Sequence, residues 1–144
     1  MNRIFFLILL FWTCGAIANP EPTRVSLLKL IATPEKYSGK LVAVEGYLHV
    51  KFEDSVLYLT KDHADRLMGK EGLWVNYSDE ISFLPTSENN LGYFDAKWVT
   101  IIGVFEFSGE QNHGHMSSNS GTLNEVSRVI EQRQWYDGSI EIER

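Results

Sequence analysis

Apolar and polar residues alternate along much of this sequence, which is the pattern of β-strands with one buried face. In residues 41–50, Val42, Val44, Leu48 and Val50 fall on the same face. Similar short runs, separated by turn residues, cover residues 56–60, 73–77, 98–107 and 121–130. We therefore predict five strands and a mostly β fold.

One segment before these strands has helical spacing instead. Ser26 is a favourable N-cap, and apolar residues follow it at positions 27, 28, 30 and 31. The helix is predicted to end at Thr33-Pro34, because the residue before a proline avoids helical backbone angles. A second short helix is predicted with Asp62 as its cap, through Leu67 and Met68 and closed by Gly69.

The first and fourth predicted strands resemble each other. Residues 98–107 repeat the apolar pattern of residues 41–50, and Gly103 stands in the repeat where Gly46 stands in the first copy. A glycine inside a strong strand commonly marks a bulge or a sharp bend, and long bent strands suit a small closed sheet. We therefore expect a five-stranded OB-fold-like Greek-key barrel with a short N-terminal helix. Another small β-barrel or a β-sandwich is the alternative.

Two stretches of the sequence form recognisable patterns: the run Tyr37, Gly39, Lys40, Val42, Val44, Gly46, Tyr47, Leu48 and the later Gly114, His115, Met116 with Ser120, Gly121, Leu123. Both resemble a group of uncharacterised small bacterial proteins with an OB-fold-like barrel. The resemblance covers most of residues 26–130. It implies the barrel but no activity, because the group has none assigned.

Residues 1–18 are predicted to be a secretory signal peptide. Arg3 precedes an unbroken apolar run from Ile4 to Trp12, and Ala16-Ile17-Ala18 has the small residues of a cleavage site. The apolar run is shorter than the ~20 residues that a membrane-spanning helix needs, and no second run follows it. We expect cleavage after Ala18, which leaves residues 19–144 as a single domain without a transmembrane segment, periplasmic or secreted.

The single cysteine, Cys14, raises an alternative to this cleavage. A cysteine after an apolar run can be the attachment site of a lipid anchor, although Phe11, Trp12 and Thr13 before it are not the usual small residues. Cleavage after Ala18 would remove Cys14. The mature chain would then have no disulfide, thiol nucleophile or cysteine-ligated zinc.

The charge of the chain narrows the class of partner. Its 144 residues hold 13 Lys and Arg against 19 Asp and Glu, a formal net charge of −6. Loss of Arg3 with the signal peptide would make that charge −7. Binding to phosphate backbones needs a basic surface, so nucleic acid is not an expected partner.

A long polar stretch at residues 109–121 is the first candidate site, because long loops between strands are often functional. Its candidate ligand contacts are His113, His115, Met116 and Ser120. His113 and His115 can also ligate zinc, copper or nickel rather than calcium.

Such a metal site needs three or four protein ligands, and four other residues are available to complete it. These are His49, Asp62, His63 and Glu110. The alternative is that one histidine of the loop packs at the barrel mouth while the other is solvated. No cofactor is predicted.

Aromatic residues offer a second candidate site. Barrels of this class bind oligonucleotides or oligosaccharides on the face of their second and third strands, often by stacking. Tyr58 and Trp74 belong to those strands, so they are the candidate stacking residues. The alternative is that most aromatic rings of this chain fill the core or cover its ends.

Catalytic motifs are missing from the sequence: it contains no G-x-S-x-G, H-E-x-x-H, P-loop or G-x-G-x-x-G. We therefore expect a non-catalytic binding module whose ligand is a protein or polysaccharide of the cell envelope. Two alternatives stay open. One is a periplasmic inhibitor or immunity-type protein, and the other is a metal-binding protein or metal-dependent enzyme built on His113 and His115.

Overall fold

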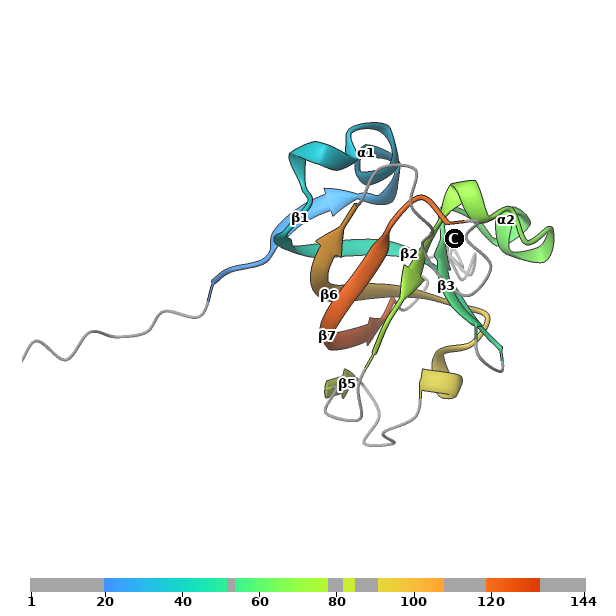
Figure 1. The fold of residues 1–144 in the computed structure, drawn as a ribbon. Coiled ribbons are helices and arrows are strands. Elements are labelled where there is room, and N and C mark those ends of the chain that lie inside the picture. The colour runs from blue at the N-terminus through green and yellow to red at the C-terminus, as the bar shows by residue number, and fades with distance from the viewer. Residues whose placement is uncertain (1–19, 52–53, 78–81, 85–90, 108–118, 133–144) are drawn as a thin grey trace, which may run out of the picture.

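The structure is a computed structural model that describes residues 20–51, 54–77, 82–84, 91–107 and 119–132. Strands dominate these residues, and the mostly β prediction is confirmed (Figure 1). The strands are β1 (Thr23–Ser26), β2 (Lys40–Lys51), β3 (Asp54–Tyr58), β4 (Gly72–Val75), β5 (Ser82–Leu84), β6 (Lys97–Glu106) and β7 (Thr122–Glu131). The helices are α1 (Leu27–Ala32) and α2 (Lys61–Asp65), with 3-10 turns η1 (Pro34–Lys36), η2 (Gly69–Glu71) and η3 (Leu91–Phe94). The predicted signal peptide and Cys14 lie outside the described residues.

The long strands pair with one another in a ring. β2 pairs with β3 and β6, β3 pairs with β4, and β6 pairs with β7, all antiparallel. The ring closes where β4 meets β7 in parallel, but only Trp74 and Val75 take part from β4. Because this junction is so short, the ring is not a regular barrel.

Two strands of the structure were missed by the sequence pattern. β1 lies parallel to residues 42–45 of β2, and β5 lies parallel to residues 128–130 of β7. They are four and three residues long, which is too short for alternation to stand out from the surrounding loops. Each of the two segments is a strand because it forms backbone hydrogen bonds with a strand that is distant in the sequence.

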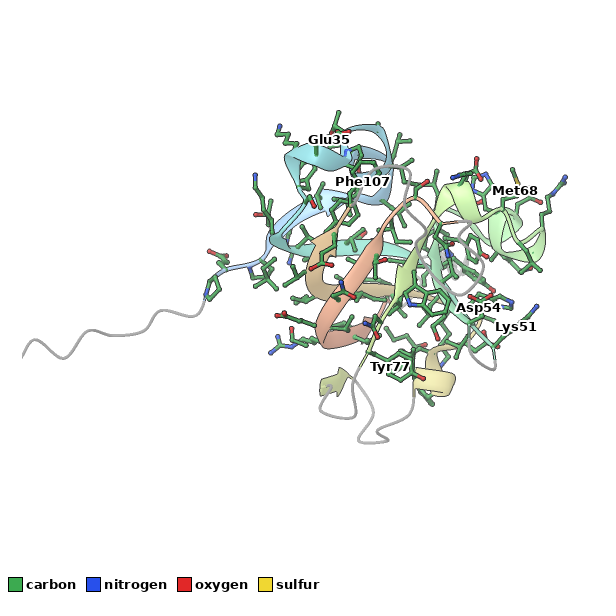
Figure 2. All side chains as sticks on the ribbon, in the orientation of Figure 1. Glu35, Lys51, Asp54, Met68, Tyr77 and Phe107 are labelled. Atoms are coloured by element: carbon green, nitrogen blue, oxygen red, sulfur yellow. The ribbon has the colours of Figure 1, made fainter. Side chains whose placement is uncertain are left out.

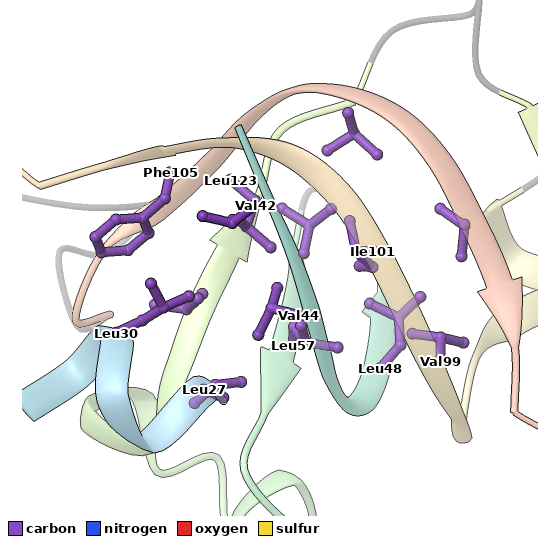
Figure 3. Close-up of a cluster of buried hydrophobic side chains, with 14 of the residues drawn as sticks. Leu27, Leu30, Val42, Val44, Leu48, Leu57, Val99, Ile101, Phe105 and Leu123 are labelled. Atoms are coloured by element: carbon purple, nitrogen blue, oxygen red, sulfur yellow. The ribbon is translucent and has the colours of Figure 1, made fainter. Parts of the chain in front are cut away.

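The inward face of the ring forms the hydrophobic core. Val42, Val44 and Leu48 of β2 are fully buried there, together with Val99 and Ile101 of β6 (Figure 3). These residues alternate with less buried ones along both strands. The period-two pattern of residues 41–50 therefore reports a strand with one core face, as predicted.

Helix α1 packs against this core beside the strands (Figures 1 and 3). Its N-cap is Ser26, whose Oγ accepts a hydrogen bond from the Lys29 backbone N–H at 3.3 Å. Leu27 and Leu30 are buried in the core, whereas Leu28 is 58% exposed. The helix ends at Ala32, before Thr33-Pro34, so the predicted N-terminal helix is confirmed with its cap and its stop.

The second helix differs from its prediction. α2 begins at Lys61, and Thr60 is its cap, with Oγ1 accepting from the His63 backbone N–H at 3.2 Å. It ends at Asp65, because Leu67 has a φ of +53°. Left-handed backbone cannot continue an α-helix. The predicted helix, with Asp62 as its cap and running through Met68, was therefore wrong at both ends.

The two glycines of the repeated pattern both lie where another strand comes very close. A Cβ at Gly46 would stand 2.7 Å from the Tyr58 carbonyl oxygen, and one at Gly103 would stand 2.8 Å from the Asn124 carbonyl oxygen. The pairing of β6 with β7 also shifts register between Ile102 and Val104, around Gly103. Both positions therefore need a residue without a side chain.

Candidate functional site

The outward face of the ring carries a second apolar cluster, made largely of aromatic rings. We call it the outer cluster; its buried members are Tyr47, Val56, Tyr58 and Ala64, and Trp74 and Trp98 pack against them half-buried. The strand residues come from the positions between core residues, so they point away from the core. Ala64 of α2 covers part of the cluster, and Figure 1 shows α2 beside β3.

Tyr47 and Trp98 meet through the pairing of two strands that are far apart in sequence. They face each other across β2 and β6, and their rings stand edge to face with centroids 5.8 Å apart. Edge-to-face contact is a favoured arrangement of aromatic rings. It holds the Trp98 indole in place while leaving part of it accessible.

Trp98 lines two surface hollows. The first, which we call the β1 hollow, is about 470 Å³ and is lined by Arg24, Val25, Ser26, Leu27, Lys29, Ala43, Glu45, Leu59, Trp98 and Thr100. The second, the Lys97 hollow, is about 450 Å³ and is lined by Tyr47, Lys61, Ala96, Lys97, Trp98, Glu131 and Gln132. The indole is therefore the side chain that the two hollows share.

The cations of the Lys97 hollow are already paired. Lys97 forms an ion pair with Glu131 at 3.2 Å and lies 3.5 Å from the centre of the Tyr93 ring. Desolvation lowers the pKa of Lys97, but its hydrogen bonds to Glu131 and Tyr93 outweigh that and raise it overall. Lys61 pairs with Asp65, and this hydrogen bond raises the pKa of Lys61. Both lysines therefore stay charged and paired with their carboxylates.

The cations of the β1 hollow have no such partners. Arg24 and Lys29 are exposed, and neither forms an ion pair with any residue that the structure describes. Glu45, the carboxylate of this hollow, is likewise without an ion pair among those residues. The hollow thus offers, beside an indole, one acceptor and two cationic donors that no described residue pairs with.

Of the two aromatic residues predicted to bind, Tyr58 lies inside the outer cluster. It is only 3% exposed, and burial raises the pKa of its hydroxyl, with a smaller contribution from the carboxylate of Asp54. A ring that is covered in this way offers no free face for stacking.

Trp74, the other predicted residue, is half-buried at a different edge of the cluster from Trp98. It lines a smaller hollow of about 150 Å³, together with Lys51, Asp54 and Tyr77. Lys51 and Asp54 face each other where β2 turns into β3, and both are labelled in Figure 2. Tyr58 and Trp74 therefore belong to one cluster but do not share a hollow.

The loop candidates are only partly described. Ser120 anchors the end of its loop to the start of β4: its Oγ donates to the Lys70 carbonyl oxygen at 2.7 Å, and its backbone N–H donates to Gly72. This is a structural contact. His113, His115 and Met116 lie outside the described residues, so the predicted loop site stays a prediction.

Of the four residues proposed to complete a metal site, Glu110 lies outside the described residues, and the other three each have a different environment. His49 Nδ1 lies 3.3 Å from Asp95 Oδ1, Asp62 pairs with Arg66 on α2, and Nδ1 of His63 is buried with no hydrogen-bond partner in the structure. In the described part of the chain no three His, Cys, Asp or Glu side chains gather as a metal site would require. The same residues include no helix long and apolar enough to span a membrane.

Comparison with known proteins adds little to this geometry. No family model matches the chain, and no curated protein matches it in sequence. Among solved structures, it is similar to a chain described as an aspartyl-tRNA synthetase from Leishmania major Friedlin. The TM-score is 0.43 and the identity 12%, and the match covers 82% of this chain and 22% of that chain. A likeness of this size establishes neither a shared fold nor a shared activity.

Tyr47 and Trp98 belong to the aromatic residues considered for the second candidate site but were not singled out as stacking residues, although the sequence holds a signal for them. Tyr47 precedes the core residue Leu48, and Trp98 precedes the core residue Val99. Strict alternation therefore places both rings on the outward face. That the two rings meet depends on the register of β2 and β6, which no local pattern reports.

Proposed function

We propose that the chain is an exported, non-catalytic binding module on an OB-fold-like barrel, and that it binds a polysaccharide of the cell envelope around Trp98. The order of strand pairing supports the OB-fold: β2, β3, β4, β7, β6 and back to β2, with one parallel junction between β4 and β7. Barrels of that class bind ligands on the face of their second and third strands, which here are β3 and β4. Because α2 covers part of that face, the proposed site lies beside it, on β2 and β6. The resemblance to small bacterial proteins of this kind belongs to the same proposal.

One observation supports the position of the site: Trp98 is a half-buried indole with a hollow of several hundred Å³ on each side. A chain of sugar units has apolar C–H faces that pack on aromatic rings and hydroxyls that pair with polar side chains. Glu45 in the β1 hollow supplies such a group. Thr100 Oγ1 accepts a hydrogen bond from Gln132 Nε2, which leaves the Thr100 hydroxyl proton and the Gln132 carbonyl oxygen for a ligand. A polymer crossing Trp98 would use both hollows at once.

Substitution of Trp98 tests the site. With polysaccharide fractions of the producing cell's envelope as the probe, calorimetry or affinity electrophoresis should show that Trp98→Ala weakens binding about tenfold or more, the size expected for a central aromatic contact. Trp74→Ala is the matched control, because Trp74 packs on the same cluster but lines neither hollow. Circular dichroism verifies that both variants fold.

Two outcomes of this experiment, and one of a separate mass measurement, oppose the proposal. Loss of binding in Trp74→Ala but not in Trp98→Ala would move the site to the edge near β4. No retention of any polysaccharide, with one envelope protein bound at equal stoichiometry, would favour the inhibitor or immunity-type alternative. An intact mass of the natively exported protein that includes a lipid on Cys14, rather than a chain beginning at Asn19, would contradict the proposed cleavage.

A further inference from the structure

The charges around the β1 hollow narrow the class of ligand. The chain as a whole is acidic, with 19 acidic against 13 basic residues, yet this hollow is lined by Arg24 and Lys29 against the single carboxylate of Glu45. We infer that the β1 hollow receives a sugar unit bearing an anionic group, a carboxylate or a sulfate. This inference rests on the proposed polysaccharide function.

The backbone arrangement puts these groups on one surface. β1 lies alongside β2 with Arg24 opposite Ala43 and Ser26 opposite Glu45. Val25, between them, packs against the core, so Arg24 and Ser26 point outward. Lys29 joins them from the first turn of α1, and Trp98 and Thr100 come from β6 on the other side of β2. The hollow thus has an aromatic wall on one side and cations on the other.

The two hollows differ in whether their cations are already ion-paired, and therefore in the ligands that they can bind. In the Lys97 hollow, Glu131 and Asp65 already neutralise Lys97 and Lys61. In the β1 hollow, the guanidinium and the ammonium group have no ion-pair partner among the described residues, so both can donate to an incoming anion. Arginine holds a carboxylate or sulfate through two parallel hydrogen bonds, and such charge-assisted bonds are stronger than neutral ones.

The floor of the hollow suits a sugar ring rather than a small inorganic anion. Val25, Ala43, Leu59 and the Trp98 indole are all among its lining residues. An inorganic anion gains nothing from apolar side chains, whereas a pyranose ring buries its C–H face against them. Glu45 then accepts from ring hydroxyls at the same time as the cations bind the charged substituent. The anionic unit therefore sits next to Trp98, and the polymer continues past the indole into the Lys97 hollow.

A pair of matched probes tests the inference. Calorimetry of the exported protein with an oligogalacturonate hexamer, and with the same hexamer fully methyl-esterified, compares a charged with an uncharged form of one sugar chain. A hexamer of an uncharged sugar that carries sulfate esters separates a carboxylate from a sulfate requirement. Tighter binding of either anionic probe supports the inference. We expect the anionic form to bind about tenfold more tightly than the ester, and this ratio should fall as salt is raised.

Substitutions assign the preference to the two cations. In the double variant Arg24→Gln with Lys29→Gln, the ratio of acid to ester affinity should fall toward one. The single control Lys70→Gln also removes a cation, but Lys70 lies in η2 and lines neither hollow. It should keep the ratio of the unaltered protein.

Two results would overturn the inference while leaving the proposed function intact. The ester could bind as tightly as both anionic probes, in a manner that still depends on Trp98. Alternatively, the double variant could keep the full preference for the acid. If no oligosaccharide binds and envelope polysaccharide is not retained either, the proposed function itself fails.

Discussion

Tyr58 shows at the scale of one residue how burial changes the chemistry of a side chain. Its ring lies in the outer cluster under Ala64, and burial, with a smaller effect of Asp54, raises the pKa of its hydroxyl above the usual 10.0. The aromatic character that made Tyr58 a candidate in the sequence therefore contributes to stability. In the proposed function, ligand stacking falls to the more accessible Trp98.

This raised pKa predicts a loss of stability at alkaline pH. Below pH 10.0 the hydroxyl is protonated in both the folded and the unfolded chain, so its contribution to stability is complete. As the pH rises from there toward the higher pKa of the folded state, only the unfolded chain gains by ionising, and the free energy of unfolding falls.

Tyr58→Phe should remove that part of the pH dependence. Urea unfolding between pH 8 and pH 11, followed by circular dichroism, should show a shallower alkaline decline for Tyr58→Phe than for the unaltered protein. Tyr77→Phe is the control, since Tyr77 is 45% exposed and its variant should decline like the unaltered protein. Equal slopes for all three proteins would show that Tyr58 titrates no differently in the folded chain.

Helix α1 shows at the scale of the element that only one side of a short helix matters for stability. Leu30 is fully buried in the core, and Leu28, in the same helix, is 58% exposed. Leu30→Ala should lower the free energy of unfolding by about 2–5 kcal/mol, because it removes buried methyl groups and leaves a cavity. Leu28→Ala should change it by less than about 0.5 kcal/mol. Denaturant unfolding measures both, and similar losses would mean that α1 is not docked on the core as described.

At the scale of the whole molecule, the ring is expected to be uneven in stability. β2 and β6 pair continuously from Lys40 to Leu48, with core residues along both strands, whereas β1 is a short edge strand and the β4–β7 junction involves only Trp74 and Val75. Amide hydrogen exchange should therefore be slowest in the middle of β2 and β6 and faster in β1. Exchange in β1 as slow as in β2 would contradict this order.

The two sides of the proposed site are expected to differ in local stability in the same way. The β1 hollow is bounded by the edge strand β1 on one side and by the central strands β2 and β6 on the other. A ligand bridging the two would tie the edge strand to the stable part of the ring. Bound polysaccharide should then slow amide exchange in β1 more than in β6, which the same measurement can follow.

The residues that alternate in the sequence determined much of the fold. Val42, Val44 and Leu48, with their counterparts in β6, specify which face of each long strand meets the core, because side chains point to opposite faces at successive positions. Ser26 and Pro34 likewise mark the two ends of α1 through local hydrogen bonding and backbone restriction. Such features depend on a few neighbouring residues, so they can be read without the structure.

What covers the outward face was decided only by the tertiary structure. Tyr58 is next in sequence to the core residue Leu57, and Trp98 is next to the core residue Val99, so the sequence places both rings on the outward face. In the structure, α2 packs beside Tyr58 and leaves Trp98 between two hollows. The strand β1, which brings Arg24 beside Ala43, exists because it pairs with β2. Local periodicity sets the direction of a side chain, whereas its neighbours and its exposure depend on contacts between residues far apart in the chain.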